Sequence, residues 1–512
     1  MYYCYRKKRY IMIYLANSRE MKSIDTYSIE TLGIPSAVLM ERAAYATAVR
    51  ICEVLKDTEG KKVIAVCGSG NNGGDGLAVV RILTTMGVSS AWYMAGDTAK
   101  ATKETALQIK ILENMKVPRC RSLDELTQAD LIVDAIFGIG LTRPVEGNFA
   151  RTVEAINRCR AIGRAAVCAV DIPSGISTDT GQVLGCAVEA DFTVTFGTLK
   201  TGLVLYPGAC HSGQVFVENI GFPIEATDQA RIHTFAFEKE DIVRYLPKRQ
   251  AYSNKGSYGR VLVIAGSKNM AGACFFSARA AYNCGCGLVR VFTVQENHDV
   301  ILEKLPEAVL TTYDSTLVDM DLLDQAIEWA DSVVLGPGLT CAPYAVNIVA
   351  YTLKHCKVPL VIDADGLNII AGNGSLWDSV PQNTVFTPHL GEMSRLSSMP
   401  VGQMCLDLPK TCREFAKNHG IICVLKDART IVSDGANCFI NLSGNDGMAT
   451  GGSGDVLSGI IGGFLAQKMD PLTAAAFGCF VHGLAGDAAR KEKGAYGLLA
   501  SDIIQYMSKI IR

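Results

Sequence analysis

The second half of the chain is organised around Gly444-Asn445-Asp446-Gly447-Met448-Ala449-Thr450-Gly451-Gly452-Ser453-Gly454-Asp455-Val456-Leu457-Ser458-Gly459. Four glycines within nine residues would destabilise a helix or strand, so we expect a loop whose backbone closely approaches a ligand. Apolar residues then recur at helical spacing, which predicts a helix beginning at about Ser453 or Gly454. Free N–H groups at a positive helix end bind anions, and Asp455 follows them. The stretch therefore predicts a phosphate-binding loop beside a general base, and a flexible loop capped by an aspartate is the alternative.

Length and composition limit the function classes. A chain of 512 residues is too long for one core, so we expect at least two domains. The 49 basic and 51 acidic residues nearly cancel, which gives no reason to expect a nucleic acid or an anionic membrane as partner. Many of the 18 cysteines lie in apolar runs without C-x-x-C spacing, which favours reduced core thiols and a cytoplasmic location.

Neither a signal peptide nor a membrane span is expected. The basic residues 6–9 precede an apolar run too short for a signal sequence, and no small-residue cleavage pattern follows it. Elsewhere we find no uninterrupted apolar stretch of about 18 residues, so the sequence predicts no membrane-spanning helix.

The first half begins with helical spacing over 17–55, interrupted by a turn at 33–36. The apolar run 63–67 is typical of a parallel strand covered on both faces, and the glycine-rich residues 68–76 follow it as a loop. Helical spacing resumes over 77–86. Strand, glycine loop and helix form a dinucleotide-type arrangement, but the spacing does not fit G-x-G-x-x-G of ordinary nicotinamide dehydrogenases.

Two further strands of the first half, expected at 131–133 and 166–170, are followed by polar residues. The carboxyl ends of parallel strands share one edge of a sheet, so we expect their polar side chains to converge there. The side chains are Asn72, Asp75, Asp134, Asp171 and Ser174. Oxygen ligands without His or Cys favour a hard monovalent or divalent cation over zinc. Taken singly, each aspartate is better explained as a loop cap than as a ligand, and only the set of them favours a site.

The pattern lapses over 221–250, which predicts a linker or the first helix of a new domain. A second series of strands is expected at 261–267, 287–291, 333–338, 360–366, 384–389 and 421–426. These strands end in glycine or polar residues and alternate with helical segments. The second half is therefore predicted to be another α/β domain, with the 444–459 stretch near its end.

Several polar groups follow the strands of this second series. His389 follows a strand and precedes Gly391 and Glu392, a position that favours a role in ligand binding. Residues 426–430 lie between two strands and form either a nucleotide contact or a solvated turn. Gly336-Pro337-Gly338 permits close backbone approach, and Asp363 and Asp365 are candidates to orient water or metal. We expect the helix dipole to keep Asp455 ionised, ready to deprotonate a hydroxyl beside a nucleotide phosphate. No Walker lysine motif is present, so the phosphate site is not a P-loop.

Ordered motifs cover nearly the whole chain. In the first half they are Gly33-Ile34-Pro35, Leu39-Met40-Glu41-Arg42-Ala43-Ala44, Gly70-Asn71-Asn72-Gly73-Gly74-Asp75-Gly76, Asp134-Ala135-Ile136-Phe137-Gly138-Ile139-Gly140 and Asp171-Ile172-Pro173-Ser174-Gly175. In the second half they are Lys255-Gly256-Ser257-Tyr258-Gly259-Arg260-Val261, Gly336-Pro337-Gly338, Asp363-Ala364-Asp365, Thr387-Pro388-His389-Leu390-Gly391-Glu392 and the 444–459 stretch. With these motifs the chain resembles the bifunctional NAD(P)H-hydrate repair enzymes of bacteria. These enzymes fuse an epimerase to a nucleotide-dependent dehydratase of the ribokinase-like superfamily.

The resemblance implies a Rossmann-like three-layer epimerase domain over 12–224. The residues implied to bind the hydrated nicotinamide nucleotide are Asn71, Asn72, Gly73, Gly74, Asp75, Gly138, Ile139, Gly140, Leu141, Thr142, Arg143, Pro144 and Asp171. Asn72, Asp134 and Ser174 would coordinate K⁺, which agrees with the oxygen-only set above. Epimerisation requires the ring to open, or the hydroxyl to leave and return, and Asp171 is our candidate proton shuttle.

The resemblance likewise implies a ribokinase-like α/β dehydratase domain over 236–512 that uses Mg²⁺ and ADP. Ala273, Gly338, His389 and Asp455 would surround the hydrate, and Lys426, Asp427, Ala428, Arg429, Thr430 and Gly454 would bind the adenine nucleotide. The implied reaction phosphorylates the hydrate's hydroxyl with Asp455 as base and then eliminates phosphate, restoring NAD(P)H. The resemblance also implies a homo-oligomer, a tetramer or larger.

Two departures and two alternatives accompany this interpretation. Asp427 stands where the family usually has glycine, and the family's usual start matches Met12, so residues 1–11 form either an extension or a misassigned start. One alternative is a ribokinase-like small-molecule kinase with a noncatalytic first half. The other is an interaction protein, since folds like the first half occur in RNA-decapping scaffolds. ADP and ATP, and NADH and NADPH hydrates, are all compatible with the sequence.

Overall fold

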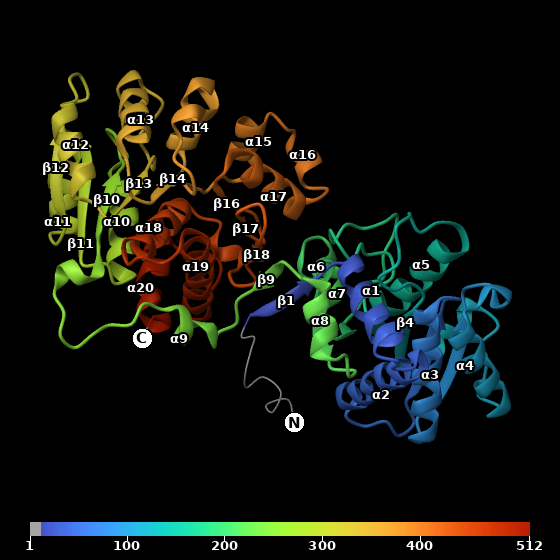
Figure 1. The fold of residues 1–512 in the computed structure, drawn as a ribbon. Helices are drawn as coiled ribbons and strands as arrows, with labels where there is room; N and C mark the ends of the chain where they lie inside the picture. The colour runs from blue at the N-terminus through green and yellow to red at the C-terminus, as the bar shows by residue number, and fades with distance from the viewer. Residues whose placement is uncertain (1–11, 512) are drawn as a thin grey trace. The chain divides into compact units, whose positions relative to one another are not determined.

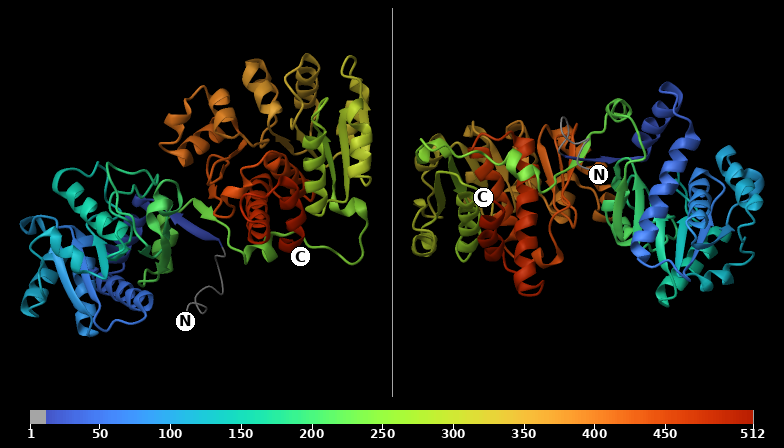
Figure 2. Two further views of the ribbon diagram at one scale, coloured as in Figure 1. Left: turned by 180° about the vertical axis from the view of Figure 1, so that it is seen from behind. Right: turned by 90° about the horizontal axis from the view of Figure 1, so that it is seen from below.

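The computed structural model describes residues 12–511, and the possible extension 1–11 lies outside them. The chain forms two compact units, one of which is Ile13–Ile232. The other begins at His233 and includes Met12. Figure 1 shows that each unit is built from a sheet with helices on its faces, and Figure 2 shows the same units from behind and from below.

The first unit contains a parallel sheet in the order β3-β2-β4-β5-β6-β8. Its strands are β2 (Lys62–Cys67), β3 (Ser89–Met94), β4 (Leu131–Ala135), β5 (Ala166–Val170), β6 (Phe192–Phe196) and β8 (Gln214–Glu218). A short parallel pair, β1 (Ile13–Ala16) and β7 (Leu199–Lys200), lies beside it. The helices are α1 (Ser18–Thr26), α2 (Ser36–Leu55), α3 (Asn71–Thr85), α4 (Lys103–Asn114), α5 (Gly147–Ala161), α6 (Thr201–Val204), α7 (Gly208–Ser212) and α8 (Ile224–Ala230).

Two hydrophobic cores, one on each face of this sheet, make the first unit a three-layer structure. Helices α2 and α3 pack on one face, and α5 packs on the other. Residues Val63 to Cys67 of β2 are completely buried, as expected for a strand covered on both sides. The predicted three-layer α/β class of this half is therefore confirmed.

The second unit is built on a larger sheet in the order β12-β11-β10-β13-β14-β15-β16-β17-β18-β9. The strands are β9 (Thr234–Ala236), β10 (Arg260–Ile264), β11 (Leu288–Val294), β12 (Val309–Tyr313), β13 (Ser332–Leu335), β14 (Leu360–Ile362), β15 (Val385–Phe386), β16 (Ile422–Leu425), β17 (Ile431–Ser433) and β18 (Cys438–Ile440). The sheet is parallel from β12 to β16, after which β17 and β18 form an antiparallel hairpin. All six strands predicted in this half are present, so its α/β class is also confirmed.

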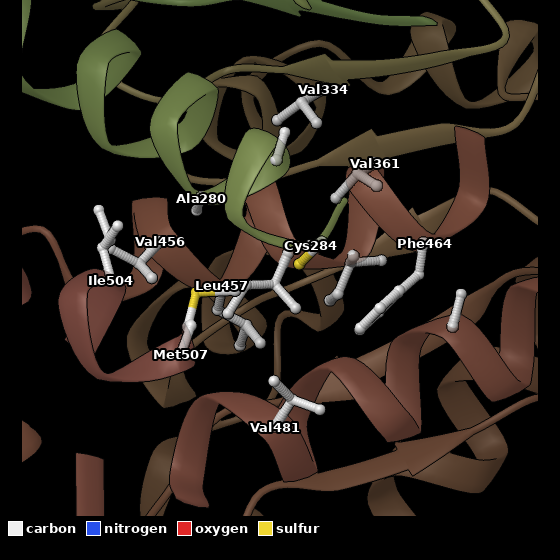
Figure 3. Close-up of a cluster of buried hydrophobic side chains, with 14 of the residues drawn as sticks. Ala280, Cys284, Val334, Val361, Val456, Leu457, Phe464, Val481, Ile504 and Met507 are labelled. Carbon is white, nitrogen blue, oxygen red and sulfur yellow. The ribbon is translucent and has the colours of Figure 1, made fainter. Parts of the chain in front are cut away.

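Helices cover both faces of the second sheet. They are α9 (Asp241–Tyr245), α10 (Ala271–Asn283), α11 (His298–Lys304), α12 (Met320–Trp329), α13 (Pro343–His355), α14 (Asp365–Gly372), α15 (Leu390–Ser397), α16 (Val401–Met404), α17 (Leu408–His419), α18 (Ser453–Ala466), α19 (Pro471–Lys493) and α20 (Ala500–Ile510). Figure 3 shows the core in which Val456, Leu457 and Phe464 of α18 pack between the sheet and neighbouring helices. Among the described residues α19 alone is long and apolar enough to cross a membrane, but most of it is buried in this core.

One sequence expectation about secondary structure needs correction. The loop predicted over 68–76 is largely helical, because α3 begins at Asn71 rather than at 77. Glycine is needed there for close packing: a Cβ on Gly73 would lie 1.8 Å from the carbonyl oxygen of Gly68, and one on Gly76 would lie 2.4 Å from the Cβ of Ala135. The segment 221–250 contains the boundary between the two units, after Ile232, and α9 is the first helix of the second unit, as predicted. It also contains α8 and β9, and β9 pairs with β18 as a strand of the second sheet.

Candidate active sites

The 444–459 stretch has the predicted form of a loop that ends in a helix. Asp446–Met448 forms a single 3-10 turn, Gly452 adopts a left-handed conformation with φ of 88°, and α18 begins at Ser453. Asp455 is thus the third residue of a helix, where the first N–H groups have no partner within the helix. The geometry provides a positive helix end with a carboxylate at its rim.

Helix α19 holds this loop in place. Asp487 accepts hydrogen bonds from the backbone N–H of Gly444 at 3.0 Å and from Nδ2 of Asn445 at 2.9 Å. Met448 packs against Gly486, where a Cβ would lie only 2.2 Å from its Sδ, so glycine is needed for this contact. His482 is buried, its Nε2 lies 3.3 Å from Oγ of Ser453, and burial lowers its pKa to about 4. Sequence reasoning missed these groups, although the glycines of an otherwise apolar helix were a signal of close packing.

Lys426, at the end of β16, joins the loop to two buried carboxylates. Its Nζ lies 2.9 Å from Oδ1 of Asp363 and 4.0 Å from Oε2 of Glu392. A Cβ on Gly454 would lie 3.3 Å from the same Nζ, so glycine lets the helix end approach the ammonium group. Burial lowers the pKa of Lys426, but the charges of Asp363 and Glu392 outweigh it and the pKa lies above its usual value.

Asp455 is not kept fully ionised by the helix dipole, which corrects the sequence expectation. Burial, followed by the negative charge of Asp363, raises its pKa to about 7, and Lys426 offsets only part of this. Asp365 and Glu392 add to the increase. A carboxyl group with a pKa near neutrality is suited to accept a proton from a hydroxyl group and release it again.

His389 caps the N-terminus of α15. Its Nδ1 accepts hydrogen bonds from the N–H groups of Gly391 at 3.0 Å and Glu392 at 3.3 Å, so the ring proton of the neutral form is on Nε2. Its backbone N–H donates to Oε2 of Glu392 at 2.9 Å, which completes a capping box. His389 also pairs with Lys426 through a β-bridge, and its side chain is 54% exposed. The predicted residues His389, Lys426, Gly454 and Asp455 therefore lie in one region.

The other residues predicted in this half line the surrounding loops. Gly338 has φ of 63° and contacts Ala273, because a Cβ on Gly338 would lie 2.8 Å from the Cβ of Ala273. Asp427 and Ala428 are exposed in the turn between β16 and β17. The remaining two residues face the loop after β18: Nη1 of Arg429 donates to the Leu442 carbonyl at 3.0 Å, and the Thr430 carbonyl accepts from the Asn441 N–H at 2.9 Å.

In the first unit, Asp134 and Ser174 form a buried polar centre. Oγ of Ser174 donates to Oδ1 of Asp134 at 2.6 Å, and its N–H donates to Oδ2 at 2.7 Å. The N–H of Phe137 donates to Oγ of Ser174 at 2.9 Å. Burial raises the pKa of Asp134 to about 6, although the hydrogen bonds from Ser174 oppose this, so the carboxyl is ionised at neutral pH.

Asn72 lies in the same region. A Cβ on Gly138 would lie 3.1 Å from Oδ1 of Asn72, which places the amide against the loop after β4. Nδ2 of Asn72 is buried without a hydrogen-bond partner. The described residues contain no group of three or more His, Cys, Asp or Glu side chains that could hold a metal ion. The region therefore offers one carboxylate, that of Asp134, with the neutral oxygen atoms of Ser174 and Asn72 near it.

The other predicted hydrate contacts are divided between buried and exposed positions. Asn71 is exposed at the start of α3, whereas Gly73 and Gly74 are buried where the helix packs. In the loop after β4, Gly138, Ile139 and Leu141 are partly exposed, and Gly140, Thr142, Arg143 and Pro144 are exposed. Sequence reasoning thus identified an accessible loop beside the polar centre.

Asp171 follows β5 in a left-handed conformation, with φ of 66°. Its Oδ1 accepts from Nζ of Lys200 at 2.6 Å, from Oγ1 of Thr195 at 3.1 Å and from the N–H of Phe196 at 3.3 Å. Lys200 is completely buried, and sequence reasoning missed it because lysine is rarely found inside a fold. Burial lowers the pKa of Lys200, and Asp171 opposes this effect.

Two more carboxyl groups interact electrostatically with Asp171. Burial, followed by the charge of Asp171, raises the pKa of Asp75 on α3 well above its usual value. The same two causes raise the pKa of Asp25 on α1. The raised pKa values of Asp75 and Asp25 favour their protonated forms, whereas Asp171 is paired with the ammonium group of Lys200. Such a set of groups is suitable for acid–base chemistry.

Comparisons with known proteins agree with this division. Residues 36–202 match the family described as YjeF-related protein N-terminus, and residues 261–509 match the family described as NAD(P)H-hydrate dehydratase. The chain is 37% identical to a bifunctional NAD(P)H-hydrate repair enzyme of Thermofilum pendens, over 97% of this chain and 96% of the relative. It is 34% identical to the enzyme of that description from Escherichia coli, over 94% and 91% of the two chains. An ADP/ATP-dependent NAD(P)H-hydrate dehydratase from Bacillus subtilis, co-crystallised with ATP/Mg²⁺, is 28% identical over 53% of this chain and 96% of its own, with a TM-score of 0.48.

Proposed function

Because the chain belongs to the family of bifunctional NAD(P)H-hydrate repair enzymes, we propose that it restores hydrated NADH and NADPH. The epimerase domain, proposed over 12–224 and formed almost entirely by the first unit, interconverts the R and S hydrates. The second unit, with a dehydratase domain over 236–512, converts the S hydrate to NAD(P)H at the expense of ADP, giving AMP and phosphate. The observation that supports this best is Asp455, a carboxyl with a pKa of about 7 at a positive helix end beside Lys426.

In the dehydratase, the N–H groups at the start of α18 bind the transferred phosphoryl group, and Lys426 balances its charge. Asp455 accepts the proton of the hydrate's hydroxyl as oxygen attacks phosphorus, and AMP leaves. The ring nitrogen then expels phosphate, a far better leaving group than hydroxide, and loss of a ring proton gives NAD(P)H. Ala273, Gly338 and His389 surround the hydrate, while the 426–430 turn and Gly454 hold the nucleotide.

Mg²⁺ would neutralise the charge on the nucleotide's phosphates during transfer. Mg²⁺ in such sites is usually bound through phosphate oxygens, water and one or two carboxylates. In the first unit, Asn72, Asp134 and Ser174 would hold K⁺, whose charge would anchor the hydrate beside the loop over 138–144. Asp171 exchanges the proton that epimerisation requires.

We also propose a cytoplasmic homo-oligomer, a tetramer or larger. The cysteines of the described residues are free thiols, which supports a reducing compartment. Light scattering of the purified protein tests the assembly, and a monomer at micromolar concentration would contradict it.

Incubation of the purified protein with separated R and S hydrates and ADP or ATP tests the function. Recovery of reduced-cofactor absorbance from S hydrate requires nucleotide, and recovery from R hydrate also requires the first unit. A phosphorylated product that accumulates without NAD(P)H would favour a small-molecule kinase. Absence of both activities with either nucleotide would leave only a binding role and contradict the proposal.

A further inference from the structure

Lys200 is an unusual residue for the interior of a sheet-based unit. It is 0% exposed, and its Nζ donates to Oδ1 of Asp171 at 2.6 Å, to Oγ1 of Thr195 at 2.8 Å and to the carbonyl of Phe196 at 2.7 Å. A lysine ammonium group has three N–H donors, and all three are used by the protein. Lys200 therefore has no donor left for a substrate, and any effect on a reaction must pass through its partners.

The two carboxylate oxygens of Asp171 differ in their surroundings. Oδ1 accepts from Lys200, Thr195 and the N–H of Phe196, whereas Oδ2 has no donor among the described residues. The side chain of Asp171 is 14% exposed, so it is accessible from the site. The left-handed backbone conformation, with φ of 66°, turns this residue away from the direction of β5. One oxygen is therefore fixed, and the other is free for chemistry.

We propose that Lys200 is a positioning residue of the epimerase site, which fixes Asp171 through Oδ1 so that Oδ2 exchanges the proton with the hydrate. The inference rests on the proposed epimerase function and assigns a residue to it. In other proteins, apolar side chains of similar volume often replace a buried ion pair without loss of stability, so the ion pair of Lys200 is weak evidence for a purely stabilising role.

The neighbouring carboxyl groups supply the complementary half of the reaction. Asp75 lies at the start of α3, three residues after Asn72, and interacts electrostatically with Asp171; it donates its proton to the hydrate's hydroxyl. The C–O bond breaks as the ring nitrogen's lone pair forms a C=N bond, and water leaves. Water then adds to the other face of the ring, the C=N electrons return to nitrogen, and Oδ2 of Asp171 accepts the proton that water loses. Solvent returns that proton to Asp75 for the next cycle.

The test compares Lys200→Met with Asp171→Asn and with the double variant, and Thr195→Val serves as a matched control that leaves the charge in place. We expect Lys200→Met to lower kcat for epimerisation by about 100-fold with little change in KM. Thr195→Val removes one neutral donor to Oδ1 and one neutral acceptor of Lys200, so we expect it to lower kcat by less than about tenfold. The double variant should be no slower than Asp171→Asn within about twofold, because Lys200 acts through Asp171.

The second unit supplies an internal control for folding. Each variant should dehydrate purified S hydrate at the wild-type rate, and its first unit should keep a cooperative unfolding transition. If Lys200→Met alone fails to fold, the epimerase kcat of Asp171→Asn is compared with that of the double variant. Neither of these two variants has a buried Asp171 charge without a partner, so their kcat values test the role of Lys200. Wild-type epimerisation in Lys200→Met, or a double variant at least tenfold slower than Asp171→Asn, would overturn the inference. A wild-type chain without epimerase activity would instead overturn the proposed function, and the inference with it.

Discussion

Lowering the pH from about 8 to about 6 should lower kcat/KM of the dehydratase, because Asp455 becomes protonated. Burial and the charge of Asp363 raise its pKa to about 7. About nine-tenths of the carboxyl groups are then ionised at pH 8 and about one-tenth at pH 6, so kcat/KM should fall about tenfold. An aspartate with its usual pKa would be almost fully ionised at both values and would give a flat profile over this interval.

The assay follows reduced-cofactor absorbance from purified S hydrate at low substrate concentration and saturating nucleotide. Asp455→Asn should lower kcat/KM by about 100-fold or more and remove the pH dependence from the residual rate. Protein held at acid pH and returned to about pH 8 before the assay controls for irreversible inactivation. A flat wild-type profile from about pH 8 to about pH 5 would refute the assignment of Asp455 as a base with a raised pKa.

Three further predictions concern the same two sites. The pKa of Asp455 is higher in the folded than in the unfolded chain, so ionisation of this carboxyl lowers the free energy of unfolding as pH rises from about 4 to about 7. Asp455→Asn cannot ionise, so at pH 8 we expect urea unfolding to give it a free energy of unfolding about 1 to 4 kcal/mol higher than the wild type. Ser174→Ala removes a proposed K⁺ ligand, so the KCl concentration that gives half-maximal epimerisation should rise about tenfold or more. Choline chloride keeps the ionic strength constant in this titration, and an unchanged half-maximal concentration would exclude Ser174 as a ligand. His482→Leu removes the partner of the Ser453 hydroxyl, so kcat of the dehydratase should fall about five- to tenfold while epimerisation stays unchanged. A dehydratase rate equal to that of the wild type would show that this contact is unimportant.

Strand positions could be predicted because the parallel sheets are buried on both faces. Such strands are short apolar runs that end in polar or glycine residues, as at Val63 to Cys67 in the first unit. The start of α3 could not be predicted, because helix propensity disfavours its glycines and only contact with Gly68 and Ala135 requires them. Tertiary packing there outweighs the local preference of the sequence.

Site residues could be predicted where they follow strands or glycine loops, since topology brings those positions to one edge. Asp455 and Asp171 were predicted in this way, and they lie at the start of α18 and directly after β5. Lys200 was not, because a single lysine gives no sign in sequence that it is buried beside a carboxylate 29 residues earlier. His482 and Asp487 were missed for a similar reason, since they belong to an apolar helix that reaches the loop only in three dimensions. The pKa of Asp455 also depends on Asp363, which is distant in sequence.

The proposed function joins two activities in one chain, each located in its own unit. The most direct test is complete conversion of an R and S hydrate mixture with nucleotide, followed by absorbance, in the wild type, Asp171→Asn and Asp455→Asn. We predict full recovery of NAD(P)H by the wild type, rapid recovery of only the S fraction by Asp171→Asn, and little recovery by Asp455→Asn, which still equilibrates the epimers. Rapid, complete recovery by both variants would contradict the account.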